Sequence, residues 1–441
     1  MRTVFITCFT GLISRNILAT DAFWRLKNHP DLRIVLIAPE SRRAELEDEF
    51  GAPNVAVEGV LVPPLKGTDW ILWVLATNLL NTNTRRVQRL ARLAYDRSWF
   101  KYFVSLYLSW LGRARALRTL FRFFVARFAK TQGYQYLFER YRPDLLFATD
   151  VYTFPDVKLM LIAKRRGVKT VGMVRSWDNP TSKTLLMFIP EKLVVNTERI
   201  REEAVRLGDV PAERITVVGI PHYERYRSQE RTLREVFFRK LSLDPRKPLI
   251  LFTPPSDNYL KEDPITPVAL EALARVGAQV LVRFPLVGDV ELAGFKLPPD
   301  MVFDEPGKSP DFTEVHLSRE ADRHLADSIY HSDFVVTWAS TMIIDAAVFG
   351  KPIILIGFDA APRPYAKSIT RYYDYDHQQR ILETGGARLV KSPKELIDWC
   401  RRYLENPKID KEGRARIVTE YCGKLDGKSG ERLAAYLLQF V

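Results

Sequence analysis

The chain alternates short, almost wholly hydrophobic runs with longer stretches in which apolar and polar residues repeat at helical spacing. In the first half such runs occupy residues 3–9, 33–38 and 144–148, and they are rich in β-branched and aromatic side chains. Runs of this kind are typical of parallel strands buried on both faces. Amphipathic stretches such as 14–27 and 154–166 lie between them. Their alternation predicts a doubly wound parallel sheet.

The same alternation begins again after residue 248, behind a charged connecting segment. A chain of 441 residues is longer than one typical core, so two domains are expected. We predict an α/β protein with two Rossmann-like, doubly wound domains facing a central cleft, where ligands meet the carboxyl ends of the strands. The expected boundaries are 1–225, 226–425 and a terminal helix over 426–441. In the second domain, strands are expected at 249–252, 279–284, 334–336, 352–356 and 388–390, helices at 266–276, 319–331 and 340–349, and a loop at 285–313.

One segment, 65–140, departs from this alternation and is expected to form a basic helical insertion in the first domain. Between Ile71 and Lys130 it holds 12 basic residues and one acid, Asp96, so this window carries +11 of the formal net charge of +13. Aromatic residues interleave with the arginines at helical spacing, as in helices that lie in a membrane interface. Basic residues near an anionic leaflet contribute about 1 kcal/mol each. The residues expected to bind the membrane are Arg85, Arg86, Arg89, Trp99, Arg113, Arg118 and Arg122.

Two other interpretations of segment 65–140 stay open. The aromatics can form the core of a packed subdomain with solvated arginines, and basic residues among aromatics also occur in nucleic-acid-binding proteins. No RRM, KH, helix-turn-helix or zinc-finger pattern accompanies the charge, so we expect no nucleic acid partner. No run reaches the roughly 20 apolar residues of a spanning helix, and the first residues fit a strand rather than a signal peptide. With three cysteines in no paired spacing, we expect a cytoplasmic protein held peripherally on the inner face of the cell membrane.

A pair of hydroxyl residues, Ser340 and Thr341, opens an expected helix directly after the strand at 334–336. Free backbone N–H groups and the positive end of the helix dipole attract anions at such a position, most often phosphate. Asp345 follows one turn later, where a carboxylate can accept hydrogen bonds from ribose hydroxyls. Ordinary N-capping of a structural helix is the alternative for the hydroxyl pair.

Four stretches of the chain resemble GT-B-fold glycosyltransferases, and most of all their CDP-glycerol glycerophosphotransferase-like branch. They are YHSDFVVTWASTMIIDAAVFGKPIILIG at 330–357, SWDNPTSK at 176–183, ITVVGIP at 215–221 and DGKSGERLAAYL at 426–437. The resemblance implies a nucleotide-activated donor bound by the second domain, and no cofactor or metal ion. It also implies that Gly219 and His222, in the loop after the strand at 215–218, and His377 contact the donor.

Further candidates come from their positions at strand ends. Arg283 ends one strand of the second domain and is expected either to pair with donor phosphates or to form a structural ion pair. Thr253 ends the neighbouring strand and is expected to line the cleft, with an ordinary turn as the alternative. Asp150 follows the strand at 144–148 and is the expected general base, with N-capping of the next helix as its alternative. Expected contacts to acceptor or cleft are Thr10, Gly11, Asp178, Asn179 and Lys183.

These observations predict a transferase that moves a group from a nucleotide-sugar or CDP-polyol donor to a glycan or lipid-linked acceptor at an anionic membrane surface. A non-hydrolysing UDP-N-acetylglucosamine 2-epimerase, which shares the fold, is the alternative enzyme. The basic insertion weighs against it, since an epimerase has no use for membrane docking. A nucleic-acid-binding or scaffold protein with a degenerate enzyme fold is the alternative of another class.

Overall fold

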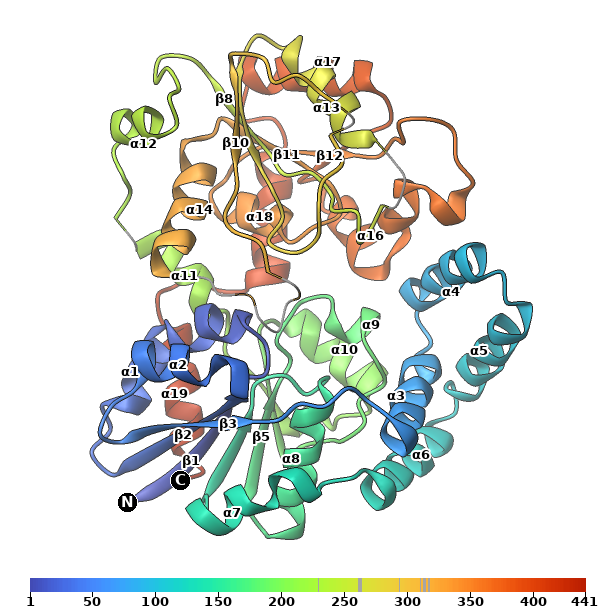
Figure 1. Ribbon diagram of the computed structural model, residues 1–441, viewed down its shortest axis with the longest axis vertical. Coiled ribbons are helices and arrows are strands. Elements are labelled where there is room, and N and C mark those ends of the chain that lie inside the picture. Colours follow the sequence, from blue (N-terminus) through green and yellow to red (C-terminus); the bar gives the residue numbers. More distant parts are fainter. Residues whose placement is uncertain (229, 261–263, 293, 310, 312–314, 316–317) are drawn as a thin grey trace. The chain divides into compact units, whose positions relative to one another are not determined.

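The computed structural model describes residues 1–441 except 229, 261–263, 293, 310, 312–314, 316 and 317 (Figure 1). The chain divides into two compact units. The first comprises Met1–Glu224 together with Gly423–Val441, and the second comprises Arg225–Cys422. The last helix therefore belongs to the first unit, although it follows the whole second unit in the sequence.

The first unit is built on a parallel sheet of seven strands in the order β3-β2-β1-β4-β5-β6-β7. Each strand is short and apolar, and its burial on both faces explains why hydrophobic runs marked the strands so clearly. The strand order changes direction beside β1, and ligands of open α/β sheets bind at such a switch point. The strands are β1 (Arg2–Thr7), β2 (Leu32–Pro39), β3 (Val55–Val60), β4 (Leu145–Ala148), β5 (Lys169–Met173), β6 (Lys192–Val195) and β7 (Ile215–Val217).

Helices cover both faces of this sheet (Figure 1). The stretch expected as one helix at 14–27 is divided into a π-helical turn, η1 (Ser14–Leu18), and α1 (Asp21–Lys27). Helix α19 (Ser429–Leu438) packs on α1, where a side chain at Gly430 would lie 2.8 Å from the backbone nitrogen of Ala22. The others are α2 (Arg43–Phe50), α7 (Gln135–Tyr141), α8 (Phe154–Arg165), α9 (Asn179–Ser182) and α10 (Glu198–Gly208), with α11 (Pro221–Ser228) leading into the second unit.

The second unit repeats the same plan with a parallel sheet in the order β10-β9-β8-β11-β12-β13. Its switch point lies between β8 and β11. Strand β10 (Met301–Asp304) corrects the expected loop at 285–313, because pairing with β9 outweighs the Pro- and Gly-rich surroundings. The other strands are β8 (Leu249–Phe252), β9 (Gln279–Arg283), β11 (Phe334–Thr337), β12 (Ile353–Ile356) and β13 (Arg388–Val390).

Helices of the second unit begin close to the expected positions. The hydroxyl pair precedes a shorter helix than expected, α15 (Met342–Val348). The remaining helices are α12 (Arg234–Lys240), α13 (Ile265–Ala274), α14 (Arg319–His331), α16 (Asp376–Glu383), α17 (Pro393–Glu405) and α18 (Lys411–Cys422). Within the described residues, no helix is both long enough and apolar enough to cross a bilayer.

The basic segment forms four helices, which lie together at one side of the first sheet (Figure 1). They are α3 (Gly67–Leu79), α4 (Asn83–Asp96), α5 (Trp99–Leu111) and α6 (Arg115–Phe128), called here the basic helices. Helix α5 directs its small polar residues inward: Ser105 Oγ donates to Asn78, and Ser109 Oγ donates to Asn81 across 3.3 Å. Its aromatic side chains point outward, and they are Trp99, Phe100, Phe103, Tyr107 and Trp110, each 58–79% exposed.

Candidate functional site

Three hydroxyl groups form a hydrogen-bonded chain at the switch point of the second sheet. Thr253 directly follows β8, and Thr337 ends the neighbouring strand β11. Thr253 Oγ1 donates to Thr337 Oγ1 across 2.6 Å, and Thr337 Oγ1 lies 3.0 Å from Ser340 Oγ. The two threonines are buried, while Ser340 is half-buried and Thr341 is exposed. The sheet therefore presents a ready row of hydroxyls where α/β proteins bind ligands.

The hydroxyl pair does not act as an ordinary helix cap. Thr341 occupies the N-cap position of α15 but makes no capping hydrogen bond through its side chain. Ser340 directs its hydroxyl to Thr337 instead. Asp345, in the first turn of α15, is only 4% exposed and lies near enough to Cys422 of α18 for its charge to affect the Cys422 thiol. Burial, and after it the Asp345 charge, raise the pKa of the Cys422 thiol well above its ordinary value.

Arg283 forms a structural ion pair, which was the alternative to pairing with donor phosphates. Its guanidinium is buried and forms an ion pair with Asp304, which ends β10. Burial alone would raise the pKa of Asp304, but the hydrogen bond from His324 and the charge of Arg283 lower it. This pair joins the ends of β9 and β10, and the expected contact of Arg283 with donor phosphates stays a prediction.

The remaining donor-side candidates lie in ordered, buried surroundings. His377, in the first turn of α16, is 6% exposed, and its carbonyl accepts a hydrogen bond from Tyr421. Gly219 and His222 belong to the first unit. Gly219 has a φ of +88°, and a Cβ there would lie 2.2 Å from Ser429 Oγ, so this position requires glycine. His222 packs on the ring of Tyr223 with the ring centroids 4.0 Å apart.

Asp150 forms an ion pair with Arg175 and does not cap the following helix, α8. Its Oδ2 accepts from Arg175 Nε across 2.8 Å, and its Oδ1 accepts from the Tyr152 backbone N–H across 3.1 Å. The cap of α8 is Thr153, whose Oγ1 accepts from the Asp156 N–H. Each Asp150 oxygen thus accepts one hydrogen bond, and the side chain is only 4% exposed. In this structure Asp150 organises the sheet edge, and its role as the general base stays a prediction.

A second buried acid, Asp156, was missed by the sequence reasoning. It lies in the first turn of α8 and accepts hydrogen bonds from Thr7 Oγ1, across 2.5 Å, and from Thr153. Thr7 in turn lies 3.2 Å from Thr149, so hydroxyls bridge β1 and β4 at the first switch point. Burial raises the pKa of Asp156 from 3.8 to about 7. The sequence signal was an acid one turn into a helix that follows a strand.

Several buried polar groups at the same edge of the first sheet have no hydrogen-bond partner among the described residues. Arg42, just after β2, is 2% exposed, and its Nη2 donates to Ser14 and to Glu45 across 2.8 Å each. Its Nε and Nη1 have no partner in the described part of the chain. The same holds for Thr10 Oγ1 after β1 and for both amide atoms of Asn179 after β5. Buried polar groups normally form hydrogen bonds, so the polar atoms at this edge can form hydrogen bonds with water or a ligand.

The other residues expected to contact the acceptor differ in their exposure and in the hydrogen bonds that they already form. Asp178 accepts from Ser176 Oγ across 2.6 Å and from Ser182 Oγ across 2.9 Å, so its carboxylate stabilises its own turn. Gly11 is buried in the loop before η1, whereas Lys183 is exposed beyond the end of α9. Sequence reasoning did not single out Arg42, since nothing in the local pattern showed that this arginine would be buried.

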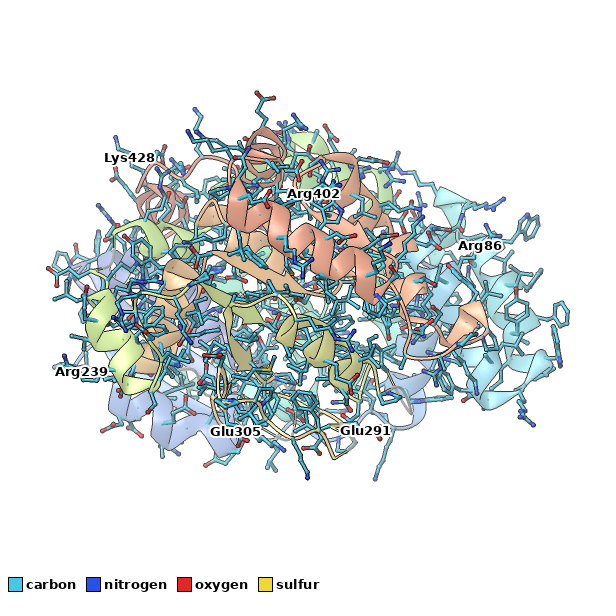
Figure 2. The ribbon with its side chains drawn as sticks, turned by 90° about the horizontal axis from the view of Figure 1, so that it is seen from above. Arg86, Arg239, Glu291, Glu305, Arg402 and Lys428 are labelled. Carbon is cyan, nitrogen blue, oxygen red and sulfur yellow. The ribbon has the colours of Figure 1, made fainter. Side chains whose placement is uncertain are left out.

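The seven residues expected to bind a membrane divide into two groups. Arg118 and Arg122 both pair with Asp209, at 2.6 and 2.9 Å, and Arg122 also donates to the Leu186 carbonyl. Arg85 and Arg89 are buried as well, at 6% and 7% exposure. These four arginines face the protein rather than solvent in this structure, so their expected membrane contact stays a prediction. Outward-facing members are Arg86 (labelled in Figure 2), Trp99 and Arg113.

Comparisons with known proteins fit this architecture. No protein-family model matches the chain, and no curated protein matches it. Among solved structures, UDP-GlcNAc 2-epimerase from Neisseria meningitidis bound to UDP-GlcNAc covers 100% of both chains at 12% identity, with a TM-score of 0.57. The wall teichoic acid polymerase TagF matches 99% of this chain and 88% of its own at 11% identity, with a TM-score of 0.52. The chain has the GT-B fold.

The same likeness extends to another epimerase, that of Methanocaldococcus jannaschii, at 12% identity, full coverage of both chains and a TM-score of 0.56. GT-B proteins consist of two Rossmann-like domains, as the two parallel sheets here show. At such low identity the resemblance concerns the fold, and the activity has to be argued from the site.

Proposed function

We propose that this protein is a GT-B transferase that moves a group from a nucleotide-activated donor, a nucleotide-sugar or a CDP-polyol, to a glycan or lipid-linked acceptor. The observation that carries the proposal is the hydroxyl row Thr253–Thr337–Ser340 at the switch point of the second sheet. Hydroxyls and backbone N–H groups at this place suit a diphosphate, whose charge grows as the bond to the transferred group breaks. GT-B structures solved with UDP-GlcNAc, UDP or CDPG lend support to a donor of this class.

The acceptor would bind at the carboxyl edge of the first sheet. Thr10, Asn179 and Arg42 offer hydrogen-bonding atoms there that have no partner within the described residues. An amide and a hydroxyl suit the hydroxyls of a sugar or polyol, and a guanidinium adds preference for an anionic acceptor. Arg42 and Asn179 follow β2 and β5, which are three strand spacings apart, or roughly 14 Å. That span matches an acceptor of more than one residue, such as a growing glycan.

Membrane docking through the basic helices completes the proposal. Eight aromatic side chains of α5 and α6 are 43–79% exposed: Trp99, Phe100, Phe103, Tyr107, Trp110, Phe123, Phe124 and Phe128. Exposed aromatic side chains gathered on two consecutive helices mark an interaction site, and the exposed basic residues Arg92, Arg97 and Lys101 lie on α4, directly after it and on α5. Their charge suits an anionic bilayer at the cytoplasmic face better than a second copy of a basic protein.

Epimerisation of UDP-N-acetylglucosamine is the second candidate, because the likeness to two UDP-GlcNAc 2-epimerases covers the full chain. The exposed aromatic surface favours the transferase, since an epimerase needs no membrane. Incubation with UDP-GlcNAc alone separates the two candidates. An epimerase converts it to a new UDP-sugar without an acceptor, whereas a transferase leaves it intact. Retention of RNA but not of anionic vesicles would instead point to the nucleic-acid-binding alternative.

A thermal-shift screen against UDP, CDP, GDP, ADP and dTDP tests the donor site. A nucleotide at a hundredfold excess over its Kd should stabilise the protein by about 2.7 kcal/mol. We expect one nucleotide to be preferred, and we expect Ser340→Ala combined with Thr341→Ala to abolish its effect. Thr419→Ala, which removes an exposed hydroxyl of α18, is the matched control and should bind normally. A flat screen, or equal stabilisation of the double variant, would contradict the proposed donor site.

A further inference from the structure

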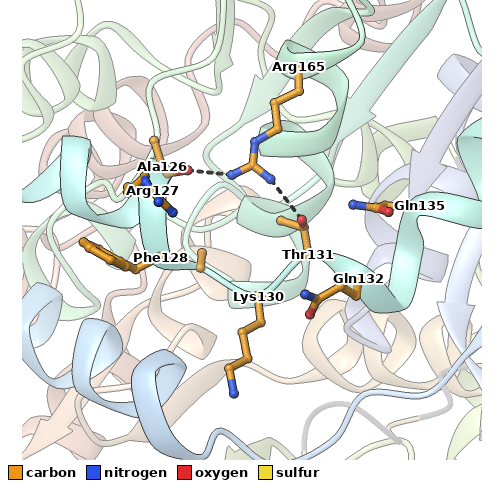
Figure 3. Close-up of a pocket in the computed structure, with 9 residues that line it drawn as sticks. Ala126, Arg127, Phe128, Lys130, Thr131, Gln132, Gln135 and Arg165 are labelled. Atoms are coloured by element: carbon orange, nitrogen blue, oxygen red, sulfur yellow. Dashed lines mark hydrogen bonds between the residues drawn. The ribbon is translucent and has the colours of Figure 1, made fainter.

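A cavity of about 570 Å³ lies at the end of α6, beside the exposed aromatic side chains (Figure 3). Its wall includes the last residues of α6, the turn that follows and the end of α8. Three cations line it, Arg127, Lys130 and Arg165, together with the amides of Gln132 and Gln135. No acid is among the lining residues described by the structure. A cavity with this lining is suited to an anion.

The cavity lies away from the edge where substrates are expected. Helix α8 starts after the carboxyl end of β4 and returns to the amino end of β5. Arg165 is its last residue, so the cavity lies toward the amino edge of the sheet. Ligands of open α/β sheets bind at the opposite, carboxyl edge. An anion held here is therefore separate from the proposed acceptor site of the first unit.

Hydrogen bonds hold the Arg165 side chain in place, and the charges of all three cations stay available. Arg165 Nη2 donates to the Ala126 carbonyl across 2.6 Å and its Nη1 donates to Thr131 Oγ1 across 3.0 Å, as the dashed lines of Figure 3 show. The backbone N–H of Lys130 donates to Asp69, whose charge is already paired with Lys158 at 2.7 Å. Arg127, Lys130 and Arg165 are exposed and form no ion pair within the part of the chain that the structure describes. Their positive charge is thus uncompensated.

The apolar neighbours of the cavity indicate what kind of anion fits. Phe128 is one of its lining residues, and Phe124 of the previous turn stacks on Phe128 with ring centroids 6.0 Å apart. Both rings are exposed, at 43% for Phe124 and 49% for Phe128. A molecule with an anionic head in the cavity could extend an apolar tail over these rings. A phospholipid has this combination of parts, whereas free phosphate has no apolar part to cover the rings.

We propose that this cavity, called here the headgroup pocket, binds the phosphate headgroup of an anionic membrane phospholipid. The proposal rests on membrane docking through the basic helices and gives that docking a specific lipid contact. Arg127 and Lys130 supply charge-assisted hydrogen bonds to the phosphate, and anchored Arg165 fixes its position. The aromatic side chains of α6 enter the interface beside the bound lipid.

Vesicle flotation with the full-length protein tests the pocket. Phosphatidylcholine vesicles with and without phosphatidylglycerol are compared for the wild type and for Arg127→Gln combined with Lys130→Gln. The matched control is Arg92→Gln combined with Arg113→Gln, which removes the same charge from exposed positions outside the pocket, one on α4 and one in the turn between α5 and α6. We expect the pocket variant to bind phosphatidylglycerol vesicles about tenfold more weakly than the control variant, because it also loses charge-assisted hydrogen bonds. Equal weakening of both variants would overturn the proposal, since bulk charge would then explain all binding.

The thermal unfolding midpoint and the nucleotide-induced stabilisation of each variant show whether a loss of vesicle binding is specific to the pocket. Arg165 is left intact in the pocket variant because it also caps α6, and the thermal unfolding midpoint should therefore match that of the control variant. If the wild type binds no anionic vesicle at all, membrane docking itself fails, and the pocket fails with it. If the wild type binds anionic vesicles but the pocket variant loses nothing beyond the control, the pocket alone fails. Nucleotide-induced stabilisation should be unchanged in every one of these variants, since the pocket belongs to the first unit and the donor hydroxyls belong to the second.

Discussion

Arg175 Nε donates to Asp150 Oδ2 across 2.8 Å, and this ion pair joins the segments that follow β4 and β5 at the carboxyl edge of the first sheet. Both side chains are nearly inaccessible, at 12% and 4% exposure. Burial alone would lower the pKa of Arg175, but the charge and the hydrogen bond of Asp150 raise it above its ordinary value. Asp150, which strand-end reasoning selected for catalysis, is therefore also the counter-ion of a buried arginine.

Replacement of one member of this pair should destabilise the protein strongly. Asp150→Asn leaves the Arg175 charge buried without its partner, and such losses typically cost about 3–5 kcal/mol. We expect a lower free energy of unfolding in urea for Asp150→Asn and a similar loss for Arg175→Met. The double variant should lose less than the sum of the two, because the residues act as a unit. Additive losses, or an unchanged stability with a selective fall in kcat, would favour Asp150 as the general base.

The raised pKa of Asp156 predicts a stability that falls as the pH rises. The folded protein holds this proton up to about pH 7, whereas the unfolded chain releases it near the ordinary value of 3.8. Between these values the folded state binds more protons, so the free energy of unfolding decreases with rising pH, by at most about 1.4 kcal/mol per pH unit. Urea unfolding from pH 4 to pH 8 measures this slope. We expect Asp156→Asn to flatten it, while the exposed Asp48→Asn, as control, should leave it unchanged.

Asp209 is predicted to attach the basic helices to the remainder of the first unit. It receives hydrogen bonds from Arg118 across 2.6 and 2.9 Å and from Arg122 across 2.9 Å. Its φ of +57° is tolerated by asparagine as well, so Asp209→Asn removes the charge without adding backbone strain. We expect this variant to lose roughly 3 kcal/mol and to show faster amide hydrogen exchange in α6. Unchanged exchange in α6 would show that other contacts hold the helix.

The exposed aromatics predict variants that lose membrane binding without losing stability. Phe100 and Phe103 are 79% and 58% exposed, and surface substitutions usually change stability by no more than about 0.5 kcal/mol. We expect Phe100→Ser with Phe103→Ser to bind anionic vesicles much more weakly in co-sedimentation while unfolding at the same temperature. Leu233→Ser, at a 70% exposed apolar residue of the second unit, is the control and should bind as the wild type does. A change of oligomeric state instead of vesicle binding would assign the surface to a second copy.

Much of the fold could be predicted because each buried strand is a short hydrophobic run that can be recognised from its own residues. The run at 334–336 and the loop that follows it were enough to place β11, Ser340 and Thr341 at a sheet edge. Strand β10 was missed, since Met301–Asp304 is only partly buried and depends on pairing with β9. Arg283 illustrates the same limit, because its partner Asp304 comes from the strand that local reasoning did not see.

The sequence alone determined the two doubly wound domains, the hydroxyl pair at a strand end and the basic, aromatic character of segment 65–140. These features depend on the hydrophobic periodicity and the composition of residues that are neighbours in the chain. Only the tertiary structure decided which charged groups are paired. Asp150 with Arg175, and Asp209 with Arg118 and Arg122, join residues far apart in the chain. It also decided that the aromatics of α5 face outward while its serines face inward. Burial and ion pairing are set by the packing of distant segments, and local sequence does not encode them.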